Sequence, residues 1–254
     1  MGLRWTIDQV ASCPSTNVEL VRRARAGEVT PPYALIALEQ TAGLGRNGRR
    51  WVTPARGAIT MSALVRPVIP ADKLGLFPLF AALAVCRVLN RAGFPAVAKW
   101  PNDVLLPAAT PAEGFGNYRK VGGILCQAVP EAGLVVGIGI NVSQTAEELP
   151  VPTATSLALY GPVPDSAALR VSILEELSNV LEQWENGGEN ELRAEFEKHC
   201  ITMGQQVSVQ HDDAAPAITG TGCHIADDGG LVISTSDGEK TTIHAGDAWL
   251  RAAS

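Results

Sequence analysis

The pattern of apolar and polar positions divides the chain into two regions. Up to residue 203, short apolar runs typical of strands alternate with longer runs typical of helices. The strand-like runs cover residues 4–10, 33–39, 58–65, 96–100, 121–129 and 133–142. We therefore expect an α+β domain over residues 1–203.

Capping signals mark where the helices of this region begin. Thr16 and Glu19 fit a capping box at the start of the first helix. Asp72 can cap a long apolar helix, and Asp165 can cap an amphipathic one. A further helix is expected over residues 189–199, after a Gly-Gly break.

Two segments depart from this alternation. Residues 107–119 are rich in Pro, Ala and Gly, and we expect a mobile surface loop there. After Gly204, short alternating strands are separated by turns rich in Asp and Gly. These strands cover residues 207–209, 218–221, 231–233 and 241–243. They predict a small β-barrel as a second domain over residues 204–254.

Composition narrows the class of protein. The 254-residue chain has a formal net charge of −6, which does not favour a broad nucleic-acid-binding face. Its five cysteines form no Cys-x-x-Cys pair, which favours a reducing cytoplasm over a disulfide framework or a thiolate zinc site. The longest apolar run, residues 74–89, is interrupted by Pro78 and predicts a buried helix. We find no signal peptide and no membrane span.

The segment from Gln40 to Trp51 is the strongest chemical signal in the chain. It combines three glycines with three arginines. Glycines let a ligand approach the main chain, and arginines bind phosphate through charge-assisted hydrogen bonds. The segment therefore predicts a loop that holds a polyphosphate, with a basic surface turn as the alternative. Its glycine spacing matches neither a P-loop nor a dinucleotide fingerprint.

Three further motifs accompany this loop. Residues 15–17 (Ser-Thr-Asn) stand at a helix start, where hydroxyls and free N–H groups either bind a polar ligand or only cap the helix. Residues 99–103 (Lys-Trp-Pro-Asn-Asp) can group a cation, an amide and a carboxylate, which suits phosphate and magnesium. Solvated charges in a turn are the alternative. Lys120 enters an apolar strand, and burying a lone lysine is costly unless it faces an anion.

Glycines recur in two of the strand-like segments. Residues 120–125 read Lys-Val-Gly-Gly-Ile-Leu, and residues 137–142 read Gly-Ile-Gly-Ile-Asn-Val. Glycines in strands allow a flat ligand to lie against the main chain, or allow close packing of a helix. Both interpretations remain open for each glycine taken separately.

Taken in this order, the motifs resemble the biotin–protein ligase (holocarboxylase synthetase) family over nearly the whole chain. The resemblance rests on Ser-Thr-Asn, Gln-Thr-Ala-Gly-x-Gly-Arg-x-Gly-Arg-x-Trp, Lys-Trp-Pro-Asn-Asp, Lys-x-x-Gly-Ile-Leu and Gly-Ile-Gly-Ile-Asn-Val. It implies a mixed sheet flanked by helices, like the catalytic domain of class II aminoacyl-tRNA synthetases, with a C-terminal SH3-like barrel. The implied reaction has two steps. Biotin and ATP give biotinyl-5′-AMP, and biotin then passes to a lysine of a biotin carboxyl carrier protein of acetyl-CoA carboxylase or a related carboxylase.

The resemblance also implies roles for individual residues. Lys120, with Arg46 and Lys99, would neutralise the biotin carboxylate and the α-phosphate as they meet. The residues implied in biotin binding are Ser15, Thr16, Asn17, Gln40, Gly43, Arg46, Lys120, Gly123 and Gly137. Those implied in ATP or adenylate binding are Arg46, Arg49, Trp51, Asn102, Asp103, Lys120, Asn141 and Arg251, with Asp103 as a ligand of Mg²⁺. Closure of the loop over the adenylate would exclude water.

One position departs from the family pattern. Leu44 stands where the family usually has a basic residue, so either a contact to the adenylate is lost or Leu44 packs in an ordered lid. There is no room for a DNA-binding segment before the first strand, so we expect a cytoplasmic ligase without repressor activity, as a monomer or homodimer. One rival interpretation is a lipoate or octanoate ligase of the same fold. The other is a catalytically weak biotin-binding regulator, for which Leu44 is the sole support.

Overall fold

A seven-stranded mixed sheet positions the candidate site. The computed structural model describes residues 3–52, 57–210, 217–244 and 246–250. The strand order is β1-β2-β3-β7-β6-β5-β4, with β1 and β2 parallel and the other neighbours antiparallel. The strands are β1 (Thr6–Val10), β2 (Tyr33–Ala37), β3 (Ala58–Val65), β4 (Val97–Lys99), β5 (Asp103–Ala112), β6 (Gly116–Val129) and β7 (Gly133–Asn141).

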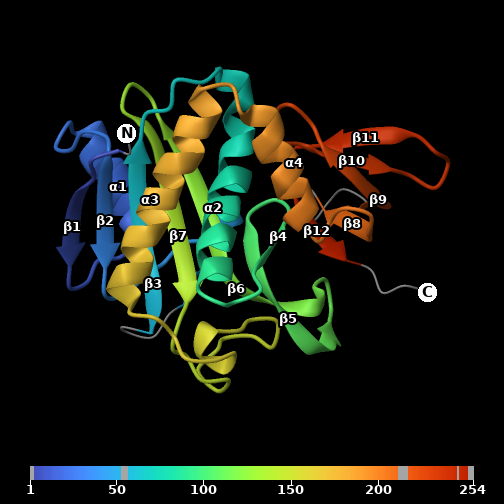
Figure 1. Cartoon of the computed structure of the whole chain (residues 1–254), viewed down its shortest axis with the longest axis horizontal. Coiled ribbons are helices and arrows are strands. Elements are labelled where there is room, and N and C mark those ends of the chain that lie inside the picture. Colours follow the sequence, from blue (N-terminus) through green and yellow to red (C-terminus); the bar gives the residue numbers. More distant parts are fainter. Residues whose placement is uncertain (1–2, 53–56, 211–216, 245, 251–254) are drawn as a thin grey trace.

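Helices cover both faces of this sheet. Helices α2 and α3 lie together over one face, and α1 packs on the other (Figure 1). Among the described residues, none of the helices has the length and apolar character needed to cross a membrane. The helices are α1 (Thr16–Arg25), α2 (Phe77–Arg91), α3 (Ser166–Glu185) and α4 (Glu189–His199), with short 3₁₀ turns η1 (Arg46–Gly48), η2 (Ala71–Leu76) and η3 (Leu157–Leu159).

Alternation along the strands gives the sheet one apolar face, and places glycines of the central strands on part of the other. In β7, Ile138 and Ile140 join the core under α2 and α3. Successive side chains of a strand point to opposite faces, so Gly137, Gly139 and Asn141 lie on the face that carries α1. On that face Gly139 is paired with Gly123 of β6. We call Gly123, Gly137 and Gly139 the glycine floor.

A second sheet follows α4 and lies to one side of the first (Figure 1). Its antiparallel strands run in the order β11-β10-β9-β8-β12. They are β8 (Gln206–Gln210), β9 (Ile218–Ile225), β10 (Leu231–Ser234), β11 (Lys240–Ile243) and β12 (Asp247–Leu250). The sequence pattern predicted the first four and missed β12. The division of the chain at residue 203 stays a prediction.

Residues 107–119 are not the mobile loop that their composition predicted. Strands β5 and β6 continue through them as a long hairpin, with Pro107 opposite Tyr118. The second sheet holds the tip of this hairpin, because the N–H of Leu250 donates to the carbonyl of Gly114 at 3.2 Å. Pairing within the hairpin and the distant contact with Leu250 thus override the weak strand propensity of Pro, Ala and Gly.

Of the two aspartates expected to cap helices, one does so. Asp165 accepts a hydrogen bond from the N–H of Ala168 at 2.9 Å and caps α3, as predicted. The prediction for Asp72 is wrong, because this residue lies inside η2 and the N-cap of α2 is Leu76. The apolar run begins with a 3₁₀ turn, which moves the start of the α-helix beyond the reach of Asp72.

Candidate active site

Lys120 and Asp103 meet because the pairing of β5 with β6 is irregular. Asp103 lies opposite Gly123, but a shift in register places Lys120 opposite Leu105. Opposite residues of an antiparallel pair share a face, so this bulge turns Lys120 to the same face as Asp103. Lys120 Nζ lies 2.5 Å from Oδ1 of Asp103.

Lys99 adds a second cation beside the same carboxylate. The residue is only 4% exposed, and its Nζ lies 3.8 Å from Oδ2 of Asp103. Burial lowers the pKa of Lys99, because the charged form loses its hydration. Burial alone would raise the pKa of Asp103, but the charges of Lys120 and Lys99 outweigh it and hold this pKa below its usual range. One carboxylate therefore faces two ammonium groups.

The glycine–arginine segment folds back on itself beside these charges. The N–H of Trp51 donates to the carbonyl of Gly43 at 2.9 Å, and Leu44 forms a β-bridge with Arg50. A Cβ on Gly43 would lie 2.4 Å from the carbonyl oxygen of Trp51. Position 43 therefore admits only glycine in this fold. The loop is closed at its base by main-chain contacts.

Side chains of this loop reach both sheets. Arg46 donates to Oδ1 of Asn102 at 3.3 Å, on the first sheet. Arg49 forms an ion pair with Asp247, the first residue of β12 in the second sheet. Leu44 is 42% exposed, so its side chain is not packed inside an ordered lid in this structure. The loop therefore lies between the two sheets.

Trp51 packs directly on the glycine floor. A Cβ on Gly139 would lie 2.7 Å from Cε2 of Trp51, and a Cβ on Gly123 would lie 3.6 Å from the same ring. Lys120 Nζ lies 5.7 Å from the ring centroid, within reach of a cation–π contact. Trp51 Nε1 is buried and has no hydrogen-bond partner among the described residues. Buried donors without a partner are uncommon in folded proteins.

A polar network, buried at Thr16, Asn17 and Ser62, surrounds the start of α1. The N–H of Thr16 donates to Oε1 of Gln40 at 2.7 Å. Ser62 Oγ lies 2.8 Å from Thr16 Oγ1 and 2.9 Å from Asn17 Oδ1. Asn17 Nδ2 donates to Oε1 of Gln127 at 2.7 Å. The network therefore ties the helix start to β3, to β6 and to the residue that opens the glycine–arginine segment.

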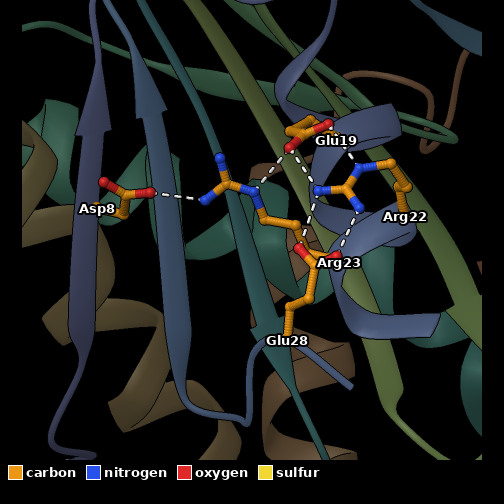
Figure 2. A network of polar contacts seen from close by, with 5 residues as sticks. All are labelled: Asp8, Glu19, Arg22, Arg23 and Glu28. Atoms are coloured by element: carbon orange, nitrogen blue, oxygen red, sulfur yellow. Dashed lines mark hydrogen bonds and ion pairs between the residues drawn. The ribbon is translucent and has the colours of Figure 1, made fainter. Parts of the chain in front are cut away.

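The predicted capping box at Thr16 and Glu19 is not formed. The N-cap of α1 is the preceding residue, which makes no side-chain capping bond. Glu19 instead binds Arg22 and Arg23, and Arg23 reaches Asp8 of β1 at 2.6 Å (Figure 2). The hydrogen bonds from the two arginines lower the pKa of Glu19 to about 2. This network fixes the outer side of α1 against the edge of the sheet.

Other predicted residues have partners that the sequence did not indicate. Gly137 makes room for Asn17, because a Cβ at position 137 would lie 2.5 Å from Asn17 Oδ1. Asn141 Nδ2 donates to the carbonyl of Thr155 at 3.0 Å, and its Oδ1 accepts from Gln144 at 3.1 Å. Asn141 therefore holds the segment that follows β7. Ser15 is buried at the N-cap of α1, and Arg251 lies outside the described residues.

A cavity of about 380 Å³ brings the predicted nucleotide-binding residues together. Sequence reasoning missed Phe115, Asp247 and Trp249 in its lining, since one lies in the segment taken for a loop and two lie on the unpredicted strand β12. The charged, amide and aromatic residues of the lining are Arg46, Arg49, Arg50, Trp51, Lys99, Asn102, Asp103, Phe115, Lys120, Asn141, Asp247 and Trp249. The polar network at Thr16 and Asn17 does not line this cavity.

The side chains present do not fit a magnesium ion held by Asp103. One of its oxygens contacts Lys120, and the other faces Lys99. The described residues contain no group of three or more His, Cys, Asp or Glu side chains that could hold a metal ion. Mg²⁺ prefers several oxygen ligands, which a carboxylate shared by two lysines does not supply.

The chain is similar to known ligases along most of its length. The model of the Biotin/lipoate A/B protein ligase family matches residues 9–144. This range includes Arg46, Lys99, Asp103 and Lys120. A biotin–[acetyl-CoA-carboxylase] ligase of Mycobacterium tuberculosis is 36% identical over 253 residues, covering 97% of this chain and 90% of that protein. The bifunctional ligase/repressor BirA of Bacillus spizizenii is 30% identical over 242 residues, covering 92% of this chain and 70% of that protein.

Solved structures give the same result. The biotin protein ligase of Aquifex aeolicus, in complex with biotin and ATP, superposes with a TM-score of 0.79 at 28% identity. The match covers 98% of this chain and 99% of that one. The chain therefore belongs to the biotin/lipoate A/B protein ligase family. Within it, these relatives along nearly the whole chain are biotin protein ligases, which confirms the resemblance and the expected fold, with its C-terminal SH3-like sheet.

Proposed function

We propose that the protein is an ATP-dependent biotin protein ligase that forms biotinyl-5′-AMP and transfers biotin to a carrier lysine. The observation that carries this proposal is the cluster of Lys120, Lys99 and Arg46 around Asp103 at one cavity. The reaction requires two anions, a carboxylate and a phosphate, to approach one another. A cationic cluster in a largely buried place lowers the energy of that approach.

In the first step, a carboxylate oxygen of biotin attacks the α-phosphorus of ATP. The bond from this phosphorus to the bridging oxygen breaks, and pyrophosphate leaves. Lys120 would contact both the carboxylate and the α-phosphate, while Lys99 and Arg46 would offset the phosphate charge. Asp103 would keep Lys120 in place before the substrates bind, because the two are already in contact.

In the second step, the ε-amine of the carrier lysine attacks the carbonyl carbon of the mixed anhydride. The bond from this carbon to the phosphate oxygen breaks, AMP leaves with the electron pair, and the amine loses a proton. The cations that served the first step would then stabilise the phosphate of AMP as a leaving group. One charge cluster therefore serves both steps.

We assign the biotin ring end to the polar network at the start of α1. Thr16, Asn17 and Ser62 offer buried donors and acceptors beside the half-buried Gln40, as a ureido group requires. Gly137 would serve this end through Asn17, for which it makes room, and Gly123 lies beside Lys120. The remaining residues assigned to this end are Ser15 and Gly43.

We assign ATP to the cavity between the glycine–arginine segment and the second sheet. Arg46 and Arg49 would contact phosphates, and Trp51 and Asn102 line the same space. Asn141 would act indirectly, by holding the segment that follows β7. The role of Arg251 follows from the family resemblance alone. Magnesium would enter as the counter-ion of ATP, held by phosphate oxygens and water, and is thus part of the substrate.

The acceptor would be a biotin carboxyl carrier domain of an acetyl-CoA carboxylase, since the Mycobacterium tuberculosis relative is named for that substrate. All five cysteines are free thiols, which suits the reducing cytoplasm that we propose as its location. A monomer or a homodimer fits this reaction. The charge cluster argues against a regulator that only binds biotin, because binding alone does not need three cations around one carboxylate.

A carrier-labelling assay tests the function. The protein is incubated with MgATP and an apo carrier domain, together with biotin in one reaction and lipoate in another. We expect a carrier that streptavidin detects in the biotin reaction and no modification with lipoate. Labelling with lipoate alone would replace the proposal with its rival. The absence of any labelling, with a carrier that a known ligase modifies, would favour the binding regulator.

A further inference from the structure

Lys99 is the most deeply buried cation of the cavity. It is 4% exposed, and among the described residues its Nζ makes no hydrogen bond. Asp103 is its ion-pair partner at 3.8 Å, whereas Lys120 lies 2.5 Å from the same carboxylate. A buried ammonium without a hydrogen bond is costly, and an incoming anion would remove that cost. Lys99 is therefore in a position to bind a phosphate of ATP other than the one that Lys120 contacts.

An aromatic ring also lies near this ammonium. Phe115 stands at the tip of the β5–β6 hairpin, and its ring centroid lies 5.0 Å from Lys99 Nζ. The face of an aromatic ring attracts a cation without neutralising its charge. The ring thus competes with Asp103 for the ammonium, which stays outside hydrogen-bond distance of the carboxylate.

Strand β12 fixes the hairpin tip at two points. The N–H of Leu250 donates to the carbonyl of Gly114 at 3.2 Å. Trp249 packs against Gly114, where a Cβ would lie 2.4 Å from Cε3 of the indole. Gly114 also has a φ of +74°, which glycine adopts without strain. The residue next to Phe115 is therefore held by the second sheet.

We propose that Phe115 is a positioning residue that keeps Lys99 turned toward the phosphates of ATP, and that Trp249 of β12 holds it there. This inference rests on the proposed function and adds a role for the second sheet in nucleotide binding. Without the ring, Lys99 would move onto Asp103 and form a second close pair. The cavity would then present less positive charge to ATP, while the biotin end would keep all its partners.

Steady-state kinetics of pyrophosphate release test this proposal on the full chain. Phe115→Leu keeps most of the apolar volume but removes the aromatic face, whereas Phe115→Tyr keeps the face. We expect Phe115→Leu to raise the KM for MgATP about 3- to 20-fold, the range of a partly desolvated cation–π contact. The KM for biotin should not change. Phe115→Tyr should behave as the wild type, and Phe115→Met replaces the leucine variant if that variant does not fold.

Two further variants distinguish the role of the hairpin tip from the role of β12, which holds it. Trp249→Leu should reproduce the pattern of Phe115→Leu, because the tip loses its packing partner. Glu113→Ala, at an exposed side chain of the same tip, should leave both KM values unchanged. Equal KM values for MgATP in the leucine and tyrosine variants, or a parallel rise in the KM for biotin, would overturn the role of Phe115. A wild-type KM in Trp249→Leu would overturn the role of β12.

This outcome is distinguishable from a failure of the proposed function. If the protein adenylates lipoate rather than biotin, the proposed function fails. The comparison of Phe115→Leu with Phe115→Tyr can still be made with lipoate as the acid, because both acids react with the same MgATP.

Discussion

The ammonium of Lys120 lies 2.5 Å from the carboxylate of Asp103, across a bulge in the pairing of β5 with β6. Had the register continued unchanged from the pair of Asp103 and Gly123, Lys120 would stand opposite Leu106. Leu106 belongs to the core under α2 and α3, so Lys120 would point into that core. One additional residue in β6 therefore decides whether this lysine can meet a substrate.

Lys120→Ala should abolish adenylate formation. The variant removes the cation that the two reacting anions would share, and it leaves Asp103 with the more distant Lys99 and Arg46. Loss of one transition-state charge contact typically costs about 10²- to 10³-fold in rate. Pyrophosphate release with biotin and MgATP measures this loss.

Lys198→Ala provides the matched control for this experiment. Lys198 is an exposed lysine of α4 outside the cavity lining, and its removal should leave the rate unchanged. Near-normal pyrophosphate release by Lys120→Ala, with biotin at saturation, would refute the role assigned to Lys120. Thermal unfolding of both variants checks that any loss is not a loss of fold.

Much of the site could be predicted because its residues sit in short continuous motifs. The three segments that carry Arg46, Lys99 and Lys120 each contain basic residues in a pattern that is unusual for a chain of net negative charge. Residues 137–142 were also predicted to form a strand whose glycines admit a close neighbour. These patterns describe local structure. The strands that they predict lie where they were expected.

The contacts that pattern reasoning missed are all non-local. The bulge that turns Lys120 to the site depends on pairing with β5, which no single segment encodes. Phe115 lies in a run whose composition indicates a loop, and the contact that holds this run, between Gly114 and Leu250 of β12, joins residues distant in sequence. The predicted capping box at Thr16 is absent for the same reason. The N–H of Thr16 donates to Gln40, which follows β2 and is distant in sequence.

Gly139→Ala should displace Trp51 from the sheet. A Cβ at this position would lie 2.7 Å from the indole, and the main chain beneath it is held by two neighbouring strands. We expect a loss of about 1–3 kcal/mol in the free energy of unfolding, as for other overpacked sites. Urea unfolding measures it, and the KM for biotin should rise because Lys120 lies beside the same ring.

Gly161→Ala is the control for this substitution. A Cβ at position 161 would have no neighbour within 4 Å, and the residue does not adopt a positive φ. The alanine should therefore leave stability unchanged or raise it slightly. Equal unfolding free energies for the two alanine variants would show that Trp51 does not need the glycine at position 139.

Asp247→Asn should loosen the glycine–arginine segment of the unliganded protein. Asp247 holds Arg49 through an ion pair, and exposed pairs of this type contribute up to about 1 kcal/mol. Amide hydrogen exchange over residues 43–50 should accelerate up to about fivefold. With biotinyl-5′-AMP bound, the variant and the wild type should exchange alike, because the phosphate replaces the carboxylate as the partner of Arg49.

Asp227→Asn is the matched control, because Asp227 lies between β9 and β10 and pairs with Arg193 of α4. It should leave exchange in residues 43–50 unchanged. Equal exchange in unliganded and adenylate-bound wild-type protein would contradict the proposal that this segment closes over the adenylate. Faster exchange in both states of Asp247→Asn would instead assign a structural role to the ion pair.

Glu19→Gln should make stability less dependent on pH at the acid end. Hydrogen bonds from Arg22 and Arg23 lower the pKa of Glu19 from 4.5 to about 2, so the folded protein releases this proton more readily than the unfolded chain. The contribution of Glu19 is therefore fully present above pH 4.5 and is lost as the pH falls toward 2. At neutral pH the variant should be less stable by about 0.5–1 kcal/mol.

Urea unfolding of both proteins between neutral pH and pH 3 should show this difference in stability closing. The control Glu175→Gln, at an exposed position of α3, should show no difference at any pH. A constant difference across the whole range would mean that the Glu19 carboxylate does not hold the outer side of α1 through its charge.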